Sequence, residues 1–371
     1  MKVLLFCSAN LETGSGSAVR ARLMAEGLAR HGARVHVVAS GIPGGFESLG
    51  IGGTVIEAGR SWAPPLAAAA DAFRPDILYG ITEAGADALM RTARAARRPV
   101  VYDLHGIGFI EVIELGRDHA FRLRRIGNSL KWLSRVPRAD AVTVANPELY
   151  PVLRVLNRKT IPVIGMTDVS HFRPDGPAVR LGNDPRKIQV LFAGNFFKWQ
   201  GVDMLMEAIG ILTRDREPFE FHLLGSIGKK AGSAPFSADV RAGGPVHARE
   251  SVDYGLVPDY YRGADVLVIP RPFMLSTHLA FPQKLVDYMA SGRAIVATDL
   301  APHRFALESP PAGILCRPTA QSLADGLRKA KDERFRAELA ANARKKAVDR
   351  FCHERQTEKV RDLFEGILAG R

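Results

Sequence analysis

The chain alternates strand-like and helix-like segments from its first residues onward. Val3–Cys7 is a continuous apolar run, residues 18–31 resemble a helix, and Val35–Ala39 is a second apolar run. A strand, a helix and a strand in this order form a βαβ unit, in which the two strands are parallel and helices cover the sheet. We therefore predict an α/β fold with doubly wound parallel sheets.

The alternation runs through two successive series, and 371 residues exceed a single ordinary core. Further strands of the first series are predicted at 77–79, 100–103, 141–144 and 161–164, and those of the second series at 189–193, 220–224, 266–270 and 295–297. We expect a first Rossmann-like domain at 1–168, a linker at 169–187, a second Rossmann-like domain at 188–350, and a C-terminal helix at 351–371.

The composition is that of a soluble globular protein, with 46% apolar and 24% charged residues. No apolar run approaches the roughly 18–20 residues of a membrane span, and Val3–Cys7 is too short for a signal peptide. Cys7, Cys316 and Cys352 are too far apart in sequence to indicate a disulfide framework or a metal site. A cytoplasmic location is expected.

The net charge of +12 indicates anionic partners. Nucleic acid, anionic lipid and phosphorylated small molecules all fit this charge. The sequence contains no zinc-finger spacing, no RNP-like aromatic motif and no clear reading helix, which disfavours nucleic acid.

Lys284 and Asp287 are three residues apart on a predicted helix at 282–291 and therefore share a face. The helix ends at Ser291-Gly292, before a strand-like run. An ammonium and a carboxylate at this spacing suit the phosphate and the ribose diol of a nucleotide. A solvated charge pair on an ordinary helix is the alternative.

Each half also has a glycine loop after its first strand. In the first half, Gly14, Ser15 and Gly16 precede a helix but lack the third glycine of a dinucleotide fingerprint. In the second half, Gly194 and Asn195 begin a loop that also contains Lys198, whose charge suits a diphosphate. Ordinary strand-to-helix loops remain the alternative for both.

Asp103 and His105 stand where a first-half strand ends, and a histidine there suits a sugar hydroxyl or a phosphate. A capping aspartate and a loop histidine are the alternative.

The segment 117–138 carries seven Arg and Lys residues, with apolar residues at helical spacing. This pattern predicts either a helix lying on an anionic membrane or a basic solvated face over a core stripe.

Taken in order, these marks resemble the retaining GT-B glycosyltransferases of glycosyltransferase family 4 (glycosyl transferases group 1) along nearly the whole chain. The marks are Gly14-Ser-Gly16, Pro75-Asp-Ile77, Tyr102-Asp-Leu-His105, Ala139-Asp-Ala-Val142, Ile161-Pro-Val-Ile164 with Asp168 and Phe172-Arg-Pro174, Phe192-Ala-Gly194 with Gly201-Val-Asp203, Leu223-Leu-Gly225, residues 257–270 and residues 281–299.

The resemblance implies two Rossmann-like domains facing across a cleft, with a nucleoside-diphosphate sugar held mainly by the second, donor domain (188–350) and an acceptor held mainly by the first, acceptor domain (1–168). It also implies that the C-terminal helix at 351–371 crosses back to the first domain. By position, Glu111 and Glu114 are candidate acceptor contacts, with a solvated helix as the alternative. It implies that the donor contacts Gly14, Ser15, Gly16, Gly194, Asn195, Gly225, Pro282 and Asp287. His105 would bind the donor sugar, and Lys284 and Lys198 would stabilise the leaving diphosphate. No metal site and no tightly bound cofactor are implied.

Three positions depart from the family pattern. Leu279 replaces a Glu eight residues before the ribose acid, and Asn195 and Gln200 replace an Arg and a Lys of the diphosphate loop. Trp199 matches a variant of that loop. Because of these departures, nucleotide binding is better supported than a carboxylate contact with the sugar.

The expected function is transfer of a sugar with retention to a glycan, a lipid-linked or another acceptor, in cell-envelope polysaccharide or glycoconjugate synthesis, with possible peripheral contact with an anionic membrane. A sugar-nucleotide epimerase on the same fold and a catalytically silent GT-B binding protein are the alternatives. The sequence does not specify the base, the sugar, the acceptor or the oligomeric state.

Overall fold

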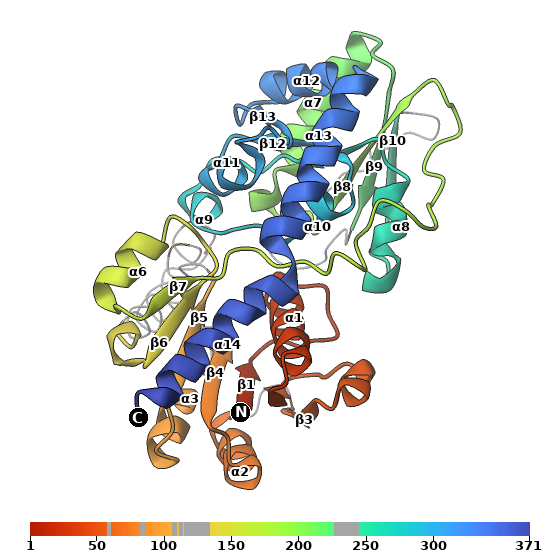
Figure 1. Cartoon of the computed structure of the whole chain (residues 1–371). Helices are drawn as coiled ribbons and strands as arrows, with labels where there is room; N and C mark the ends of the chain where they lie inside the picture. The colour runs from red at the N-terminus through yellow and green to blue at the C-terminus, as the bar shows by residue number, and fades with distance from the viewer. Residues whose placement is uncertain (58–60, 82–85, 106–109, 111–113, 115–133, 226–244) are drawn as a thin grey trace. The chain divides into compact units, whose positions relative to one another are not determined.

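The computed structural model describes residues 1–57, 61–81, 86–105, 110, 114, 134–225 and 245–371. The chain divides into two compact units (Figure 1). The first unit contains residues 1–166, 279–281 and 351–371, and the second contains residues 167–278 and 282–350. The expected linker therefore lies within the second unit, whereas the C-terminal segment returns to the first.

The described part of the first unit contains one parallel sheet. Its strand order is β3 (Gly52–Val55), β2 (Arg34–Ala39), β1 (Lys2–Cys7), β4 (Ile77–Ile81), β5 (Val100–Leu104), β6 (Ala141–Val144) and β7 (Thr160–Pro162). The central strand β1 is almost wholly apolar and buried from Val3 to Cys7, as expected for a parallel strand covered on both faces. The order reverses between β1 and β4, and ligands bind at such a switch point in open α/β sheets.

The helices of this unit are α1 (Gly16–Arg30), α2 (Ala63–Phe73), α3 (Ala86–Ala95), α6 (Tyr150–Leu156) and α14 (His353–Ala369). The C-terminal helix α14 packs on α1. A Cβ atom added at Gly27 would lie 2.3 Å from Oγ1 of Thr357, so the absence of a side chain on α1 permits this close approach. Val360, Phe364 and Ile367 of α14 are buried, and the helix belongs to the first unit.

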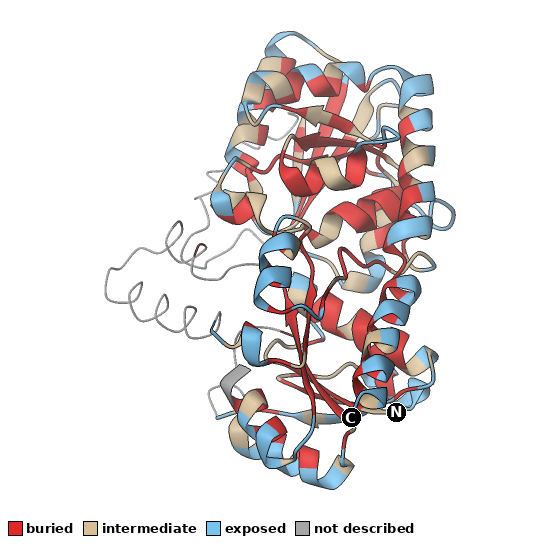
Figure 2. Cartoon of the chain, turned by 60° about the vertical axis from the view of Figure 1, so that its left-hand side comes forward, coloured by how far each residue is buried: buried red, intermediate tan, exposed pale blue. Residues whose placement is uncertain are grey.

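The described part of the second unit contains another parallel sheet. Its order is β10 (Val246–Arg249), β9 (Phe219–Leu224), β8 (Ile188–Ala193), β11 (Val266–Ile269), β12 (Ala294–Thr298) and β13 (Ile314–Cys316). The helices are α7 (Val202–Arg214), α8 (Val257–Arg262), α9 (Leu275–His278), α10 (Gln283–Ala290), α11 (Ala301–Leu307), α12 (Ala320–Lys329) and α13 (Glu333–Lys346). The order reverses between β8 and β11. Figure 2 shows the strands of both sheets as buried and the outer sides of the helices as exposed.

One core of the second unit forms where α7 and α12 cover the sheet. Phe192, Phe221 and Leu223 of the strands pack with Leu205 of α7 and Leu327 of α12. Thr319 caps the start of α12 by accepting a hydrogen bond from the Ser322 amide at 3.3 Å.

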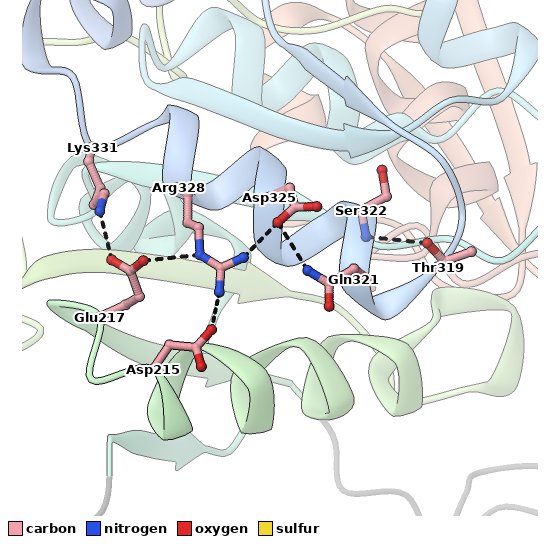
Figure 3. Close-up of polar contacts among 8 residues, drawn as sticks. All are labelled: Asp215, Glu217, Thr319, Gln321, Ser322, Asp325, Arg328 and Lys331. Atoms are coloured by element: carbon pink, nitrogen blue, oxygen red, sulfur yellow. Dashed lines mark hydrogen bonds and ion pairs between the residues drawn. The ribbon is translucent and has the colours of Figure 1, made fainter.

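A charge network joins α12 to the turn after α7 (Figure 3). Arg328 of α12 pairs with Glu217 at 3.0 Å, with Asp325 at 2.6 Å and with Asp215. Lys331 pairs with Glu217 at 2.8 Å. The network ties the two helices that cover this core.

The predicted α/β fold is confirmed, as are the strands of both series. The last strand of the first series is shifted, because the expected run at 161–164 is observed as β7, Thr160–Pro162. The edge strands β3, β10 and β13 were not predicted. Each is only three or four residues long, and β3 begins with two glycines, so none carries the long apolar run of a buried strand.

Candidate functional site

The donor candidates of the second unit gather at the carboxyl ends of β8, β9 and β11. Gly194 follows β8 at once, Gly225 follows β9, and Pro270 follows β11. These loops touch through their backbones: a Cβ at Gly225 would lie 1.9 Å from the carbonyl oxygen of Gly194, and one at Gly201 would lie 1.7 Å from that of Pro270. Glycine is required at these contacts, and the site is therefore formed largely by main chain.

Lys284 reaches this point from the first turn of α10. Its Nζ donates a hydrogen bond to Oε1 of Gln200 at 2.9 Å and lies 4.6 Å from the centre of the Phe192 ring. Gly194 has φ +145°, and a Cβ there would lie 2.2 Å from the same Nζ. The structure thus brings Lys284, Gly194 and Gly225 together, although they are far apart in sequence.

The Lys284 ammonium lies in an unfavourable electrostatic setting. Burial lowers the pKa of Lys284 to about 7, and the neighbouring charge of Arg271 acts in the same direction. Arg271 follows β11 and is itself 7% exposed. Two neighbouring cations, of which Arg271 is buried and Lys284 is half-buried, favour the binding of an anion at this point.

His303 of α11 is fully buried near these two cations. Its Nδ1 is 2.6 Å from the carbonyl oxygen of Thr298. Because a carbonyl only accepts, Nδ1 carries the proton and Nε2 is an acceptor, which has no hydrogen-bond partner among the described residues. Burial lowers the pKa of His303 to about 3, and Arg271 and Lys284 also lower it, so this ring is neutral.

Asp287 is one turn further along α10 than Lys284 and is 4% exposed. Its Oδ1 accepts hydrogen bonds from Thr167 Oγ1 at 2.8 Å and from Gln283 Nε2 at 3.2 Å. Pro282 is buried and immediately precedes α10. The role of Asp287 at a ribose stays a prediction.

The rest of the β8 loop is more open. Asn195 and Lys198 are exposed, and Trp199 stacks on Phe197 with ring centres 4.4 Å apart. Leu279, at the position where the resemblance implies an acid, instead packs with an apolar cluster of the first unit that includes Tyr102, Val142 and Leu153.

In the first unit, the loop Gly14–Gly16 is exposed and leads directly into α1. Ser15 is the residue before the helix, and its hydroxyl accepts from Thr13 Oγ1 at 3.2 Å. The loop follows β1, the strand at the switch point, as expected for a loop that contacts a ligand.

His105 stands just after β5, and a buried network holds its ring. Nε2 of His105 contacts Oδ2 of Asp103, and Arg20 of α1 binds both oxygens of that carboxylate, at 2.7 and 2.8 Å. Thr143 Oγ1 donates to Oδ1 at 2.5 Å, and the Tyr79 hydroxyl lies 3.3 Å from it. Asp103 therefore lies within β5 and is an ion-paired anchor, not a cap.

This network keeps the carboxylate charged. Burial alone would raise the pKa of Asp103, but Arg20 and His105 outweigh burial and hold it well below its usual range. The carboxylate can only accept, so Nε2 of His105 carries a proton and Nδ1 is the atom left for a ligand.

Sequence reasoning did not identify Arg20, Tyr79, Thr143, Arg271 or His303. One signal was present for Arg20, which interrupts the buried apolar stretch Ala18–Ala21 on α1. Arg271 lies between Pro270 and Pro272, just after a buried strand. Nothing in the sequence distinguishes His303.

Of the acceptor candidates, Glu111 lies outside the described residues, and Glu114 is half-buried. Residues 117–133 of the basic segment also lie outside them, and its end forms a short 3-10 helix, η2 (Val136–Arg138). Within the described ranges, no three His, Cys, Asp or Glu side chains are grouped to bind a metal ion. No described helix is long and apolar enough to cross a bilayer.

Two family models match the sequence, one in each half. The model described as "Glycosyltransferase Family 4" matches residues 14–164, and "Glycosyl transferases group 1" matches residues 187–332. A comparison with curated proteins gives no significant match.

Several solved structures share the fold along the whole chain. Sucrose-phosphate synthase from Thermosynechococcus elongatus is 18% identical with a TM-score of 0.81, and the alignment covers 100% of both chains. HepE from Anabaena in complex with UDP-glucose is 18% identical with a TM-score of 0.74, covering 99% of this chain and 100% of that one. WaaG, a glycosyltransferase involved in lipopolysaccharide biosynthesis, is 16% identical with a TM-score of 0.70, covering 98% and 100%.

The sheet orders, the two family matches and the shared fold agree with one another. The first unit matches a glycosyltransferase family 4 model over residues 14–164, the second matches a glycosyl transferases group 1 model over residues 187–332, and the chain has the GT-B fold.

Proposed function

We propose that this protein is a retaining glycosyltransferase of family 4 that transfers a sugar from a nucleoside-diphosphate sugar to a glycan or lipid-linked acceptor in cell-envelope glycan synthesis. The observation that carries the proposal is the position of Lys284. Its Nζ lies 2.2 Å from the place where a Cβ of Gly194 would stand, at the switch point of the second sheet.

The diphosphate is assigned to the main chain of Gly194 and Gly225 and to the Lys284 ammonium. In the free protein, Lys284 donates to the neutral Gln200 oxygen. A phosphate oxygen is a stronger acceptor, because a charge-assisted hydrogen bond is about twice as strong as a neutral one. When the ligand binds, the Lys284 ammonium therefore exchanges its hydrogen bond to Gln200 for one to phosphate. Lys198, on the same loop as Gln200, adds a second, exposed positive charge.

The nucleoside is assigned to Asp287, by analogy with the family motif. Asp287 is held by Thr167 and Gln283, so its carboxylate is oriented before a ribose arrives. Leu279 supplies no carboxylate, and we propose that the sugar of the donor is recognised without the acid that the family pattern places there.

In the first unit, we assign His105 to a sugar hydroxyl through Nδ1, and the Gly14–Gly16 loop to a ligand oxygen. Asp103 and Arg20 position the ring. HepE was solved in complex with UDP-glucose, which supports a uridine-nucleotide sugar as the first donor to test. WaaG is involved in lipopolysaccharide biosynthesis, which supports a cell-envelope acceptor.

Retention is proposed to follow a front-face route, in which the leaving diphosphate oxygen helps to deprotonate the acceptor hydroxyl. The role of the protein is then to stabilise the developing diphosphate charge, with Lys284 oriented before the reaction. NMR of the product anomer tests this step: an inverted anomeric centre would contradict it.

A catalytically silent binding protein is the second candidate. The packing of Leu279 into an apolar cluster favours it, because the sugar end of the site then lacks an acid. Such a protein would bind nucleotide but release none from any donor and acceptor pair.

The test begins with thermal shift over nucleoside diphosphates and nucleotide sugars. A ligand that binds only the folded state stabilises it by about 2.7 kcal/mol at one hundred times its Kd. We expect stabilisation by one nucleoside diphosphate, lost in Lys284→Met and kept in Arg328→Met, which alters the distant network of Figure 3. Conversion of the donor to an isomeric nucleotide sugar without any acceptor would favour an epimerase instead.

A further inference from the structure

Helix α6 of the first unit presents apolar side chains to solvent. It packs against β7 and η2 (Figure 1), and Leu153 is buried in the core beneath it. Its outer side carries Val152, Val155 and Leu156, which are 60%, 84% and 40% exposed. We call these three residues the α6 ridge.

The ridge is a continuous feature of one helix face. Residues at i, i+3 and i+4 are neighbours on a helix surface, so the three aliphatic side chains lie side by side. The other large exposed apolar residues of the described chain each lie in a different element or loop. Single exposed apolar residues are ordinary, whereas a grouped set indicates an interaction surface.

Exposed cations surround the ridge. Arg154 is on α6 itself, and Arg158 and Lys159 follow its end. Asn157 Nδ2 donates to the carbonyl oxygens of Val136 at 3.0 Å and Ala139 at 2.9 Å. These bonds fix η2, and with it exposed Arg138, at the carboxyl end of α6.

Among the described residues next to α6 and η2, few acids offset this charge. Glu148 is exposed just before α6, and Asp140, next to η2, is paired with Arg371 at 3.0 Å. In this described part of the surface, four cations thus outnumber the acids around an aliphatic ridge.

We propose that the α6 ridge and its cations bind the surface of an anionic lipid bilayer. Short aliphatic side chains enter the boundary between headgroups and acyl chains, while Arg and Lys remain at the lipid phosphates. Anionic bilayers attract such cations through their negative surface potential. A nucleic acid would use the cations but leave the ridge in water. Binding to the bilayer does not depend on catalysis. The further statement that it places the chain beside a lipid-linked acceptor rests on the proposed function.

The test is co-sedimentation of the full chain with vesicles of phosphatidylcholine alone and with added phosphatidylglycerol. We expect binding to the anionic vesicles to exceed binding to the neutral ones by at least about tenfold and to weaken with salt, because the Debye length falls from about 10 Å at 0.1 M to 3 Å at 1 M. Val155→Asp should weaken binding by at least about tenfold, since it places a like charge at the membrane surface. Arg158→Gln and Lys159→Gln should each weaken it by about fivefold.

Leu256→Asp is the matched control. Leu256 is 50% exposed on η4 (Tyr254–Leu256) of the second unit, so the variant makes the same chemical change on an element outside the α6 ridge and should leave vesicle binding unchanged. Because all these side chains are exposed, melting temperature and nucleoside-diphosphate affinity should stay those of the wild type, which separates this result from a failure of the proposed function.

Wild-type binding by Val155→Asp and by the Arg158→Gln, Lys159→Gln double variant would overturn the proposal. Equal binding to neutral and anionic vesicles would also overturn it. A concentration-dependent dimer that Val155→Asp dissociates, with no vesicle binding, would identify a second copy of the chain as the occupant of the ridge instead.

Discussion

In the free protein, burial lowers the pKa of the Lys284 ammonium to near neutral pH. With a pKa of about 7, it is partly deprotonated at pH 7 to 8. A bound diphosphate stabilises the charged form and raises the pKa, so ligand binding takes up a proton. The nucleotide affinity is therefore linked to pH through this one residue.

We predict that nucleoside-diphosphate affinity falls as pH rises from 7 to 9, by up to about tenfold per pH unit. Isothermal titration calorimetry over this range, in buffers of different ionisation enthalpy, measures both the affinity and the proton uptake. Lys284→Arg stays protonated and should lose the dependence. A wild-type profile as flat as that of the arginine variant would contradict the assignment.

The same lowered pKa has a consequence for stability. An unfolded lysine has its ordinary pKa of 10.5, so the unfolded chain binds more protons than the folded chain between pH 7 and 10.5. Lys284 therefore lowers the free energy of unfolding most strongly below pH 7, and this destabilisation decreases as pH rises from 7 to 10.5. In the ligand-free protein, Lys284→Met should remove this contribution from the pH dependence of the urea midpoint.

Arg20 and Arg30 lie on the same helix, yet their ion pairs differ in burial. The side chains of Arg20 and Asp103 are 5% and 0% exposed, whereas those of Arg30 and Glu354 are each 50% exposed. Arg20→Met leaves a buried carboxylate without its main partner and should cost about 3–5 kcal/mol. Arg30→Met should cost less than about 1 kcal/mol.

Urea unfolding, followed by hydrogen exchange in β1 and β5, measures both variants. Similar costs for the two variants would contradict the role given to burial. Ring NMR adds a readout specific to His105: losing Arg20 should change the chemical shifts of its ring, because Asp103 contacts Nε2, while Arg30→Met should not.

At the scale of elements, the long buried strands could be predicted because parallel strands covered on both faces are apolar throughout. The edge strands could not, because β10 reads Val-His-Ala-Arg and is held by pairing with β9 rather than by its own pattern. The glycines and Lys284 of the candidate site could be named from motif spacing. Arg20 could not, because its partner Asp103 is brought to it only by folding. His303 could not, because its partner is the backbone carbonyl of Thr298, a group that every residue carries.

The contact between α1 and α14 depends on a missing side chain. Gly27→Leu would place its Cβ 2.3 to 2.8 Å from three side-chain atoms of Thr357, so α14 must shift away from α1. We predict faster hydrogen exchange across α14 and a lower melting temperature for the first unit.

Gly366→Ala is the control for this prediction. Gly366 is on α14, but a Cβ there meets no atom within 4 Å. Alanine at this position should stabilise α14 by up to about 1 kcal/mol. Unchanged exchange in α14 of Gly27→Leu would show that the close approach does not hold the helix.

For the whole molecule, the division into two units predicts unequal responses to a ligand. If a nucleoside diphosphate binds the loops around Gly194 and Lys284, hydrogen exchange should slow at 193–201 and 282–290 of the second unit. The strands β1, β2 and β3 of the first unit should exchange as before. Protection confined to β1 and the Gly14–Gly16 loop would contradict the assignment of the nucleotide to the second unit.

The path of α14 also bears on how the chain is made. A ribosome synthesises α1 early and α14 after every other described element, yet the two helices pack together. At about 5–20 residues per second, roughly 15–65 s separate their synthesis. During that interval, the surface of α1 around Gly27 lacks its covering helix. The whole second unit is synthesised within the same interval, before α14. The second unit can therefore complete its fold first, and the N-terminal unit is the one exposed to chaperones and proteases during translation.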